Sequence, residues 1–221
     1  MPNIIAIDGP SGSGKGTISK LLAERLKYSC MDTGAMYRCC ALYFMNNDVN
    51  QEDISQVEKA LSNIEIDMKT IDDVLHVYLN GEDVSKEIRS AEVTANVSAV
   101  SAIPEVRRAM VEQQRKLAQN DNYILEGRDI GTKVFPDAFV KIYLDATPEE
   151  RAKRRLKQNQ EKGLSDQSYE EVLQAIKDRD YYDSHRETDP LRKADDAILV
   201  DSTNLTIDEV VDTIYKIVVN K

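Results

Sequence analysis

The chain has 221 residues, of which 41% are hydrophobic and 31% charged, so it is long enough to bury a core and has no composition typical of disorder. Its 39 acidic residues outnumber the 29 basic ones and give a formal net charge of −10, which argues against nucleic acid and anionic membranes as partners. A polyanion would therefore have to bind at a local basic pocket.

Cysteine usage and hydropathy favour a soluble protein in a reducing compartment. Cys30, Cys39 and Cys40 are an odd number without CxxC spacing, so neither a disulfide framework nor a zinc site is indicated. The N-terminus lacks the features of a signal peptide, and the longest apolar run, Cys39 to Met45, is too short to cross a bilayer. We expect a cytoplasmic protein.

The first predicted elements are a strand at Ile4–Asp8 and a helix after the loop GPSGSGKGT. A strand, a glycine-rich turn and a helix N-terminus direct several backbone N–H groups at one anion, whereas the GxxxxGK pattern alone can arise by chance. The helix has apolar residues at a period of 3.6, which supports this context. We assign nucleotide binding to Gly9, Pro10, Ser11, Gly12, Ser13, Gly14, Lys15, Gly16 and Thr17, with Lys15 reaching the terminal phosphates.

The loop departs from the pattern GxxxxGK[ST], because Gly16 stands where a magnesium-binding hydroxyl is usual. Thr17 lies about 100° further round the helix, so we expect it to meet a phosphate oxygen. Magnesium would then be held mostly by nucleotide and water. We place Thr17 and Glu126 near the metal, Glu126 acting through water; the alternative for Glu126 is a capped turn.

The next region suggests an inserted small subdomain. A weaker strand at Tyr28–Met31 leads into DTGAMYR, Asp32 to Arg38, at a helix start. Between Asn47 and Val100, the segments Ile64–Lys69 and Val74–Asp83 alternate like antiparallel strands.

The rest of the chain alternates short apolar runs with helical patterns, which is typical of a parallel sheet covered on both faces. Capping boxes mark several helix starts, so the fold class is α/β. The predicted strands are Tyr123–Leu125, Phe139–Leu144 and Ala197–Val200, and the capping boxes are Thr147–Glu150, Ser168–Glu171 and Thr206–Glu209.

A third motif, EGRDIGT from Glu126 to Thr132, follows the strand at Tyr123–Leu125. Ligands of doubly wound sheets lie beyond the carboxyl ends of the strands, so this motif and DTGAMYR should border the nucleotide loop. Arg38 and Arg128 are then expected to bind phosphate, although either could be an ordinary surface charge.

The charged segment Glu149–Glu171 is interpreted as a mobile helical hairpin. Arg151, Arg154 and Arg155 fall at i, i+3 and i+4 on one helix face, as lid arginines or as a solvated face paired with glutamates. The stretch DRDYYDSHRE then supplies Arg179, Asp183 and Arg186, and neither His76 nor His185 is assigned a catalytic role.

These residues favour one reaction class. A phosphate acceptor needs no general base, since its second pKa is about 6 and it is mostly dianionic at neutral pH. It needs cations that bring two polyanions together. Many arginines without a convincing base favour phosphorylation of a nucleoside monophosphate.

The motifs GPSGSGKGT, DTGAMYR, EGRDIGT followed by FPDA, and DRD…HRE…PL…AD together resemble the bacterial-type cytidylate kinase family over nearly the whole chain. Adenylate kinases are less similar, because TGDMLR-like and DGFPR-like motifs are missing. The resemblance implies a P-loop nucleoside monophosphate kinase-like core with a parallel five-stranded sheet, an inserted β-containing monophosphate-binding domain and a short helical lid. The implied boundaries are 1–36, 104–148 and 168–221 for the core, 37–103 for the monophosphate-binding domain and 149–167 for the lid.

The resemblance also implies roles for single residues. ATP with Mg²⁺ would phosphorylate CMP and dCMP, and UMP more weakly, in a monomer. Cytosine has an exocyclic donor and edge acceptors, which suits Ser98, Arg107 and Asp129. Thr33, Tyr37, Arg38 and Arg128 would hold the acceptor phosphate, Arg179 and Asp183 would lie near sugar and phosphates, Arg154 would bind ATP, and Lys15, Arg128, Arg179 and Arg186 would be catalytic.

Other classes remain as alternatives. A regulatory GTPase should carry an NKxD motif, which the sequence lacks. A different P-loop kinase could act on UMP, dTMP or a non-nucleotide acid. A nucleotide-binding subunit without catalysis is the third alternative.

Overall fold

The computed structural model describes residues 2–71, 74–162 and 167–221, and the chain divides into two compact units. The first unit is the chain up to Asp32 together with Arg115–Lys221, and the second is Thr33–Gln114. The sequence analysis drew the inserted domain more narrowly, at 37–103. The functional names of these parts stay proposals.

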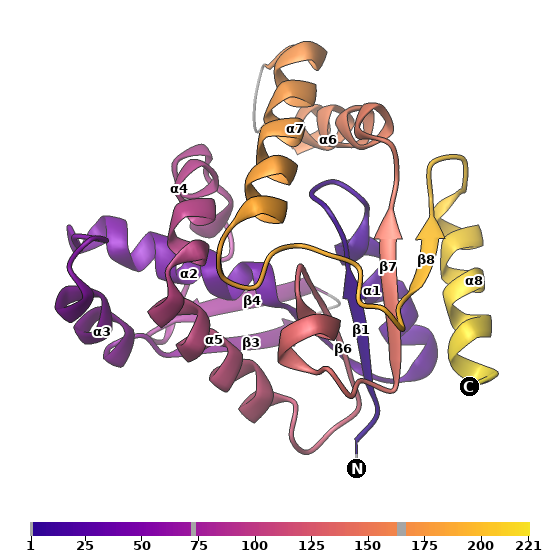
Figure 1. Ribbon diagram of the computed structural model, residues 1–221, viewed down its shortest axis with the longest axis horizontal. Helices are drawn as coiled ribbons and strands as arrows, with labels where there is room; N and C mark the ends of the chain where they lie inside the picture. Colours follow the sequence, from indigo (N-terminus) through magenta and orange to yellow (C-terminus); the bar gives the residue numbers. More distant parts are fainter. Residues whose placement is uncertain (1, 72–73, 163–166) are drawn as a thin grey trace. The chain divides into compact units, whose positions relative to one another are not determined.

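The first unit contains a five-stranded sheet in the order β2-β6-β1-β7-β8, with every neighbouring pair parallel. Figure 1 shows the adjacent strands β6, β1, β7 and β8 of this sheet. The predicted α/β class with a parallel five-stranded sheet is confirmed. The strands are β1 (Ile4–Asp8), β2 (Ser29–Asp32), β6 (Tyr123–Gly127), β7 (Val140–Asp145) and β8 (Ile198–Asp201).

Two helices of the first unit, α1 and α8, pack against this sheet. Apolar side chains of α1 and α8 form one core with those of the strands. Leu22 and Ile214 of the helices and Ile5 and Ile142 of the strands belong to it, and each is at most 1% exposed. The helices of the first unit are α1 (Lys15–Leu26), α6 (Pro148–Lys162), α7 (Tyr169–His185) and α8 (Ile207–Val219), with a short turn η2 (Ile130–Val134).

The strand register decides which polar residues lie on which face of the sheet. Ile7 pairs with Glu126 on β6 and with Ile142 on β7, so Glu126 lies on the face that α1 and α8 cover. Asp8, one residue later, points to the opposite face because side chains alternate along a strand. There it meets η2.

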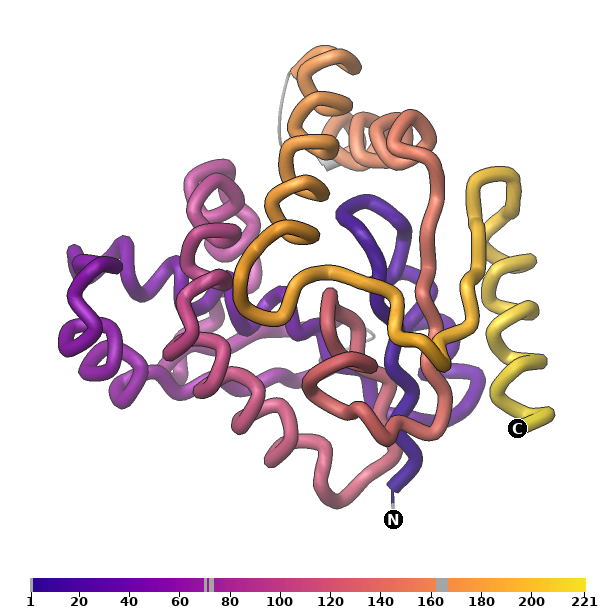
Figure 2. Tube along the Cα trace, viewed as in Figure 1, coloured from indigo at the N-terminus to yellow at the C-terminus, as the bar shows by residue number. Residues whose placement is uncertain are grey.

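Helices α6 and α7 pack against each other through a small core of Ala152, Val172 and Ile176. The predicted capping box of Ser168 and Glu171 starts α7, and the predicted box of Thr206 and Glu209 starts α8. The turn of the predicted hairpin falls at 163–166, outside the described residues, as does that part of the predicted lid. Figure 2 shows the irregular segment after α7 that leads to β8.

The second unit consists of helices and an antiparallel sheet in the order β3-β4-β5. The predicted antiparallel strands are therefore confirmed, with Met68 paired to Val77. Val57, Val77, Ile88, Val97 and Met110 are buried. The elements are α2 (Thr33–Asn46), α3 (Ile54–Ser62), β3 (Ile66–Ile71), β4 (Val74–Leu79), β5 (Glu82–Asp83), η1 (Glu87–Arg89), α4 (Ala91–Ala102) and α5 (Pro104–Leu117), whose last turn belongs to the first unit.

Two further observations concern the chain as a whole. Cys30, Cys39 and Cys40 form no disulfide, and burial raises the pKa of Cys30 to about 12. Within the described ranges, every helix is too short or too polar to cross a membrane.

Candidate active site

The loop between β1 and α1 differs from the other helix starts of the chain. Helices α3, α4, α7 and α8 are capped by the side chain of a Ser, Thr or Asp residue. At α1 the cap position is Gly14; among the described residues no side chain caps this end, and the first turn has no acid. The first N–H groups of α1 and the positive end of its dipole therefore face an anion-binding site.

Lys15 is folded onto this loop. Its Nζ donates to the carbonyl oxygens of Gly9 at 2.8 Å and Pro10 at 2.9 Å, and lies 3.4 Å from the hydroxyl of Ser13. The residue is only 6% exposed, and burial lowers the pKa of its amine. The structure thus places Lys15 in the phosphate loop, and its reach to terminal phosphates stays a prediction.

Gly16 has a structural reason that its sequence position does not reveal. A Cβ at this residue would lie 2.9 Å from Oε1 of Glu126, so the carboxylate occupies the space of the missing side chain. Thr17 is exposed on the next position of the helix. Glu126 at the end of β6 therefore brings an oxygen next to the start of α1, as the strand register requires.

This arrangement fits the chemistry of Mg²⁺, which prefers oxygen ligands and keeps several waters. Within the described part of the chain, no group of three or more His, Cys, Asp or Glu side chains could hold a metal ion. Glu126 would then be the protein carboxylate near the ion, and the phosphates of the nucleotide and water would supply the other oxygens.

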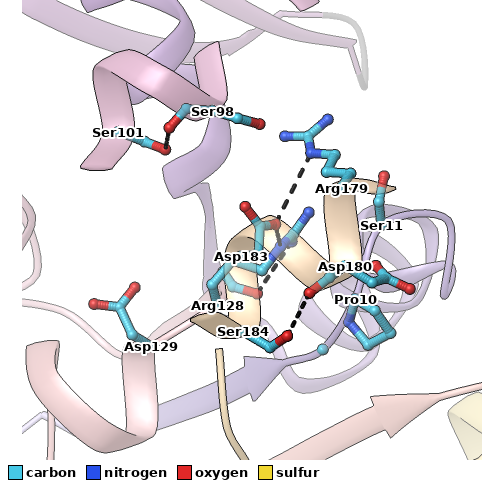
Figure 3. Close-up of polar contacts among 12 residues, drawn as sticks. Pro10, Ser11, Ser98, Ser101, Arg128, Asp129, Arg179, Asp180, Asp183 and Ser184 are labelled. Carbon is cyan, nitrogen blue, oxygen red and sulfur yellow. Dashed lines mark hydrogen bonds and ion pairs between the residues drawn. The ribbon is translucent and has the colours of Figure 1, made fainter. Parts of the chain in front are cut away.

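Arg128 follows β6 and is paired with Asp183 of α7. Its Nε lies 2.9 Å from Oδ2 of Asp183, and the Nε of Arg179 lies 3.9 Å from the same oxygen (Figure 3). Burial opposes the charge of Arg128, but the carboxylates of Asp183 and Glu126 outweigh burial and raise its pKa. Two predicted catalytic arginines thus share one carboxylate, which was predicted to bind ribose.

Asp129 and Arg186 form a second pair in the same unit. The Nη2 of Arg186 lies 3.7 Å from Oδ1 of Asp129, and both side chains are at most 5% exposed. Arg186 also donates from Nε to the carbonyl of Asp189 at 2.9 Å. The predicted cytosine reader and a predicted catalytic arginine are therefore neighbours.

Asp8, the last residue of β1, was not among the predicted site residues. Its two carboxylate oxygens accept from the N–H groups of Ile130 and Gly131, both at 2.8 Å. Burial raises the pKa of Asp8 to about 6, against these hydrogen bonds. Asp8 therefore ties the start of the phosphate loop to the turn that carries Asp129. The signal was an acid that ends a fully buried strand.

The three arginines of α6, Arg151, Arg154 and Arg155, have different partners. Arg154 donates to the carbonyl of Ser202 at 2.6 Å and lies 3.5 Å from the carbonyl of Ser13 in the loop. Arg155 donates from Nη1 to Oε1 of Gln158 at 3.2 Å, and burial lowers its pKa.

Arg151 is a correction to the expected group of lid arginines. Its side chain is 4% exposed and bonds to protein oxygens of Ser11, Ala146 and Asp180. It is part of the folded body because the first turn of α6 packs directly against the loop.

In the second unit, Arg38 and Arg107 form hydrogen bonds with residues of the same unit. Arg38 donates from Nη1 to the carbonyl of Ile88 at 2.9 Å and to Oγ1 of Thr94 at 2.8 Å. Arg107 is 1% exposed and lies 5.4 Å from the ring centre of Tyr37. Both helices α2 and α5 thus place a predicted substrate-binding arginine among polar partners.

The two predicted base-reading residues of this unit are linked. Arg107 donates to the carbonyl of Ser101 at 3.1 Å, and the hydroxyl of Ser101 donates to the carbonyl of Ser98 at 3.0 Å. Thr33 at the start of α2 is buried. The approach of Thr33, Tyr37, Arg38, Ser98 and Arg107 to the phosphate loop stays a prediction.

A parallel sheet whose first strand runs into an uncapped, glycine-rich helix start, with a buried lysine and several arginines around it, defines a P-loop kinase. Comparison with known proteins makes this specific. The family model described as "Cytidylate kinase" matches residues 5–220. The chain belongs to the cytidylate kinase family.

Named relatives agree with this assignment. A cytidylate kinase of Fusobacterium nucleatum is 51% identical over 96% of this chain and 95% of its own length. One of Lactobacillus johnsonii is 50% identical, with 98% and 94% of the two chains covered. An uncharacterized protein of Eubacterium ventriosum has a similar fold, with a TM-score of 0.53 at 13% identity over the whole of both chains. The family resemblance predicted from the motifs is confirmed.

Proposed function

We propose that this kinase transfers the terminal phosphoryl group of ATP to CMP and dCMP, giving ADP with CDP or dCDP, and that UMP is a weaker acceptor. The observation that carries the proposal is the set of cations that separate elements of one unit place on and beside the loop. Lys15 bonds to the loop carbonyls and Arg154 of α6 lies 3.5 Å from the carbonyl of Ser13. Arg128 after β6 and Arg179 of α7 lie 2.9 and 3.9 Å from the same oxygen of Asp183. Membership of the cytidylate kinase family supports the choice of acceptor.

The chemistry needs charge and not a base. An oxygen of the acceptor phosphate forms the new bond to the γ-phosphorus, and the bond from that phosphorus to the bridging oxygen of ADP breaks. Lys15 and Arg128 would neutralise the charge on the transferring group. Both histidines have other contacts, because His76 bonds to Asp83 and His185 stacks on Tyr181.

When bound, magnesium would supply positive charge that neutralises the phosphates. The residues suited to its site are Thr17, through a phosphate oxygen, and Glu126, through water. Glu126 is supported by its oxygen lying 2.9 Å from the position of a Cβ on Gly16.

The acceptor would be bound by the unit Thr33–Gln114 as the monophosphate-binding domain, with Arg38 and Arg128 on its phosphate. The chain of contacts through Ser101 supports Ser98 and Arg107 as readers of the base, with Asp129. The net charge of −10 supports small-molecule partners in the cytoplasm and not nucleic acid, and we propose a monomer with residues 149–167 as lid.

A coupled assay of ADP release tests the proposed reaction. We expect the highest kcat/KM with CMP and dCMP, a lower value with UMP, and little turnover with dTMP or a non-nucleotide acid. Equal turnover of all monophosphates would contradict the choice of base. Binding of ATP without ADP release under any of these conditions would show a nucleotide-binding protein without catalysis.

Base recognition is tested by Ser98→Ala and Asp129→Ala, with Ser62→Ala on the exposed end of α3 as control. Each of the first two should lose about 1–3 kcal/mol of discrimination between CMP and UMP, because a donor of cytosine loses its acceptor. The control should keep the ratio of the two kcat/KM values. An unchanged ratio in both active-site variants would refute the assigned roles.

A further inference from the structure

The carbonyl oxygens of the phosphate loop have dedicated donors. When the N–H groups of a loop converge on one anion, its carbonyls point away and need partners of their own. Lys15 supplies donors to Gly9 and Pro10. The carbonyl oxygens of Ser11 and Ser13 lie within 3.0 and 3.5 Å of guanidinium nitrogens of α6.

Arg151 joins three separate segments of the first unit. Its Nε donates to the carbonyl of Ala146 at 2.8 Å, and its Nη1 donates to the carbonyl of Ser11 at 3.0 Å and to Oδ2 of Asp180 at 2.6 Å. The planar guanidinium group suits this, because its donors are fixed relative to one another. The contacts fix Ser11 relative to the ends of β7 and the body of α7.

Asp180 is the carboxylate partner on α7. Figure 3 shows it beside Pro10 and Ser11, on the same helix as Arg179 and Asp183. Burial raises the pKa of Asp180, and the guanidinium of Arg151 acts in the opposite direction. The ion pair therefore holds a buried carboxylate of α7 against the group that binds the carbonyl of Ser11.

The backbone of α6 is also in close contact with the loop. Gly12 has φ +79°, and a Cβ there would lie 3.2 Å from both the Cβ and the carbonyl oxygen of Arg151. Further along the helix, the pair Lys157 and Glu161 is 78% and 63% exposed. The start of α6 is thus built into the loop, whereas Lys157 and Glu161 further along are solvated.

We propose that Arg151 and Asp180 are positioning residues that hold Ser11 and Gly12 in the anion-binding form of the loop, and thereby set the affinity for the triphosphate donor. The pair does not touch phosphate; it keeps the loop carbonyls turned outward. The inference rests on the proposed function for the identity of the donor. It makes the first turn of α6 a fixed support, so the proposed lid at 149–167 would move only beyond that turn.

The test measures ATP and CMP binding separately by calorimetry on the whole chain. Arg151→Lys keeps the charge but cannot make all the contacts of the guanidinium, so the Kd for ATP should rise about tenfold. Asp180→Asn keeps size and one acceptor, and should raise it roughly threefold. The Kd for CMP should stay within about twofold in both variants.

Lys157→Met on the exposed part of α6 is the control and should bind ATP like the wild type. Thermal unfolding of each variant shows whether it is folded, and Asp180→Asn keeps the test decisive if Arg151→Lys is unstable. Equal weakening of ATP and CMP, or unchanged ATP binding in folded variants, would overturn the inference. Since ATP binding is measured without an acceptor, a wild type that failed to phosphorylate CMP would refute the proposed function but not this result.

Discussion

Charged side chains are used differently around the phosphate loop and in the three-stranded sheet. Around the phosphate loop, Lys15 is 6% exposed and the side chain of Arg186 4%, whereas in the three-stranded sheet Lys69 and Asp67 are 60% and 50% exposed. Exposed pairs are screened by water and cost little to keep. Buried charges are expensive, and replacing them with apolar residues is often neutral or stabilising. We therefore infer that the buried charges, such as Lys15 and Arg186, are present for binding and chemistry and not for stability.

The largest effect is expected for Lys15→Met, compared with Lys69→Met in the sheet. The first should lower turnover on the order of 10³-fold, because a preorganised cation at the transferring group is lost. Its unfolding temperature should fall modestly, because the buried carbonyl oxygens of Gly9 and Pro10 lose their donor. Steady-state kinetics and thermal unfolding measure both quantities.

The control Lys69→Met should leave turnover unchanged. If Lys15→Met kept turnover within tenfold of the wild type, or lost as much stability as activity, the contrast between the two sets of charges would be wrong.

The next effect concerns pH and Asp8, with Asp83 of the sheet as control. In the folded state the pKa of Asp8 is raised from 3.8 to about 6, so between these values the folded protein binds the proton more tightly than the unfolded chain. Asp8 therefore makes the free energy of unfolding fall as pH rises from about 4 to 6, by about 3 kcal/mol in total. In Asp8→Asn this fall disappears.

Urea denaturation between pH 4 and 8 should thus show that the free energy of unfolding of Asp8→Asn, minus that of the wild type, rises with pH and levels off above about 7. In Asp83→Asn the difference should be flat over this range. The pKa of Asp83 is lowered to about 2 by the hydroxyl of Ser85 and by His76, so its contribution is lost only as pH falls from about 4 towards 2. A pH-independent difference for Asp8→Asn would contradict its buried, protonatable state.

The sequence predicted the fold because its signals are local. Apolar runs such as Ile4–Ile7 and the alternation of Val74–Asp83 report strand type directly, and Ser168 with Glu171 marks a helix start. The motifs around Lys15 and Arg128 could be read for the same reason. Each carries its glycines and charged residues within one short segment.

The parts that sequence reasoning missed depend on residues far apart in the chain. The spacing of Arg151 showed its helix face, but not that Ser11, 140 positions earlier, would receive its hydrogen bond. Asp8 was predicted only as the end of a strand. Its role could not be seen in the sequence, because its partners Ile130 and Gly131 belong to a distant turn. Gly16 was recognised as a departure from the usual motif. The reason for it is Glu126, which the pairing of β6 with β1 brings close to Gly16.

The smallest of these effects is expected for Gly16→Ser, which asks whether Glu126 truly occupies the place of the usual hydroxyl. Because a Cβ at Gly16 would lie 2.9 Å from Oε1 of Glu126, the serine should displace this flexible carboxylate at a cost of less than about 1 kcal/mol of stability. Glu126→Asp shortens the acid and should remove most of that cost in the double variant. Urea denaturation of the four proteins gives the coupling energy, and purely additive losses would show that Gly16 and Glu126 do not compete for this space.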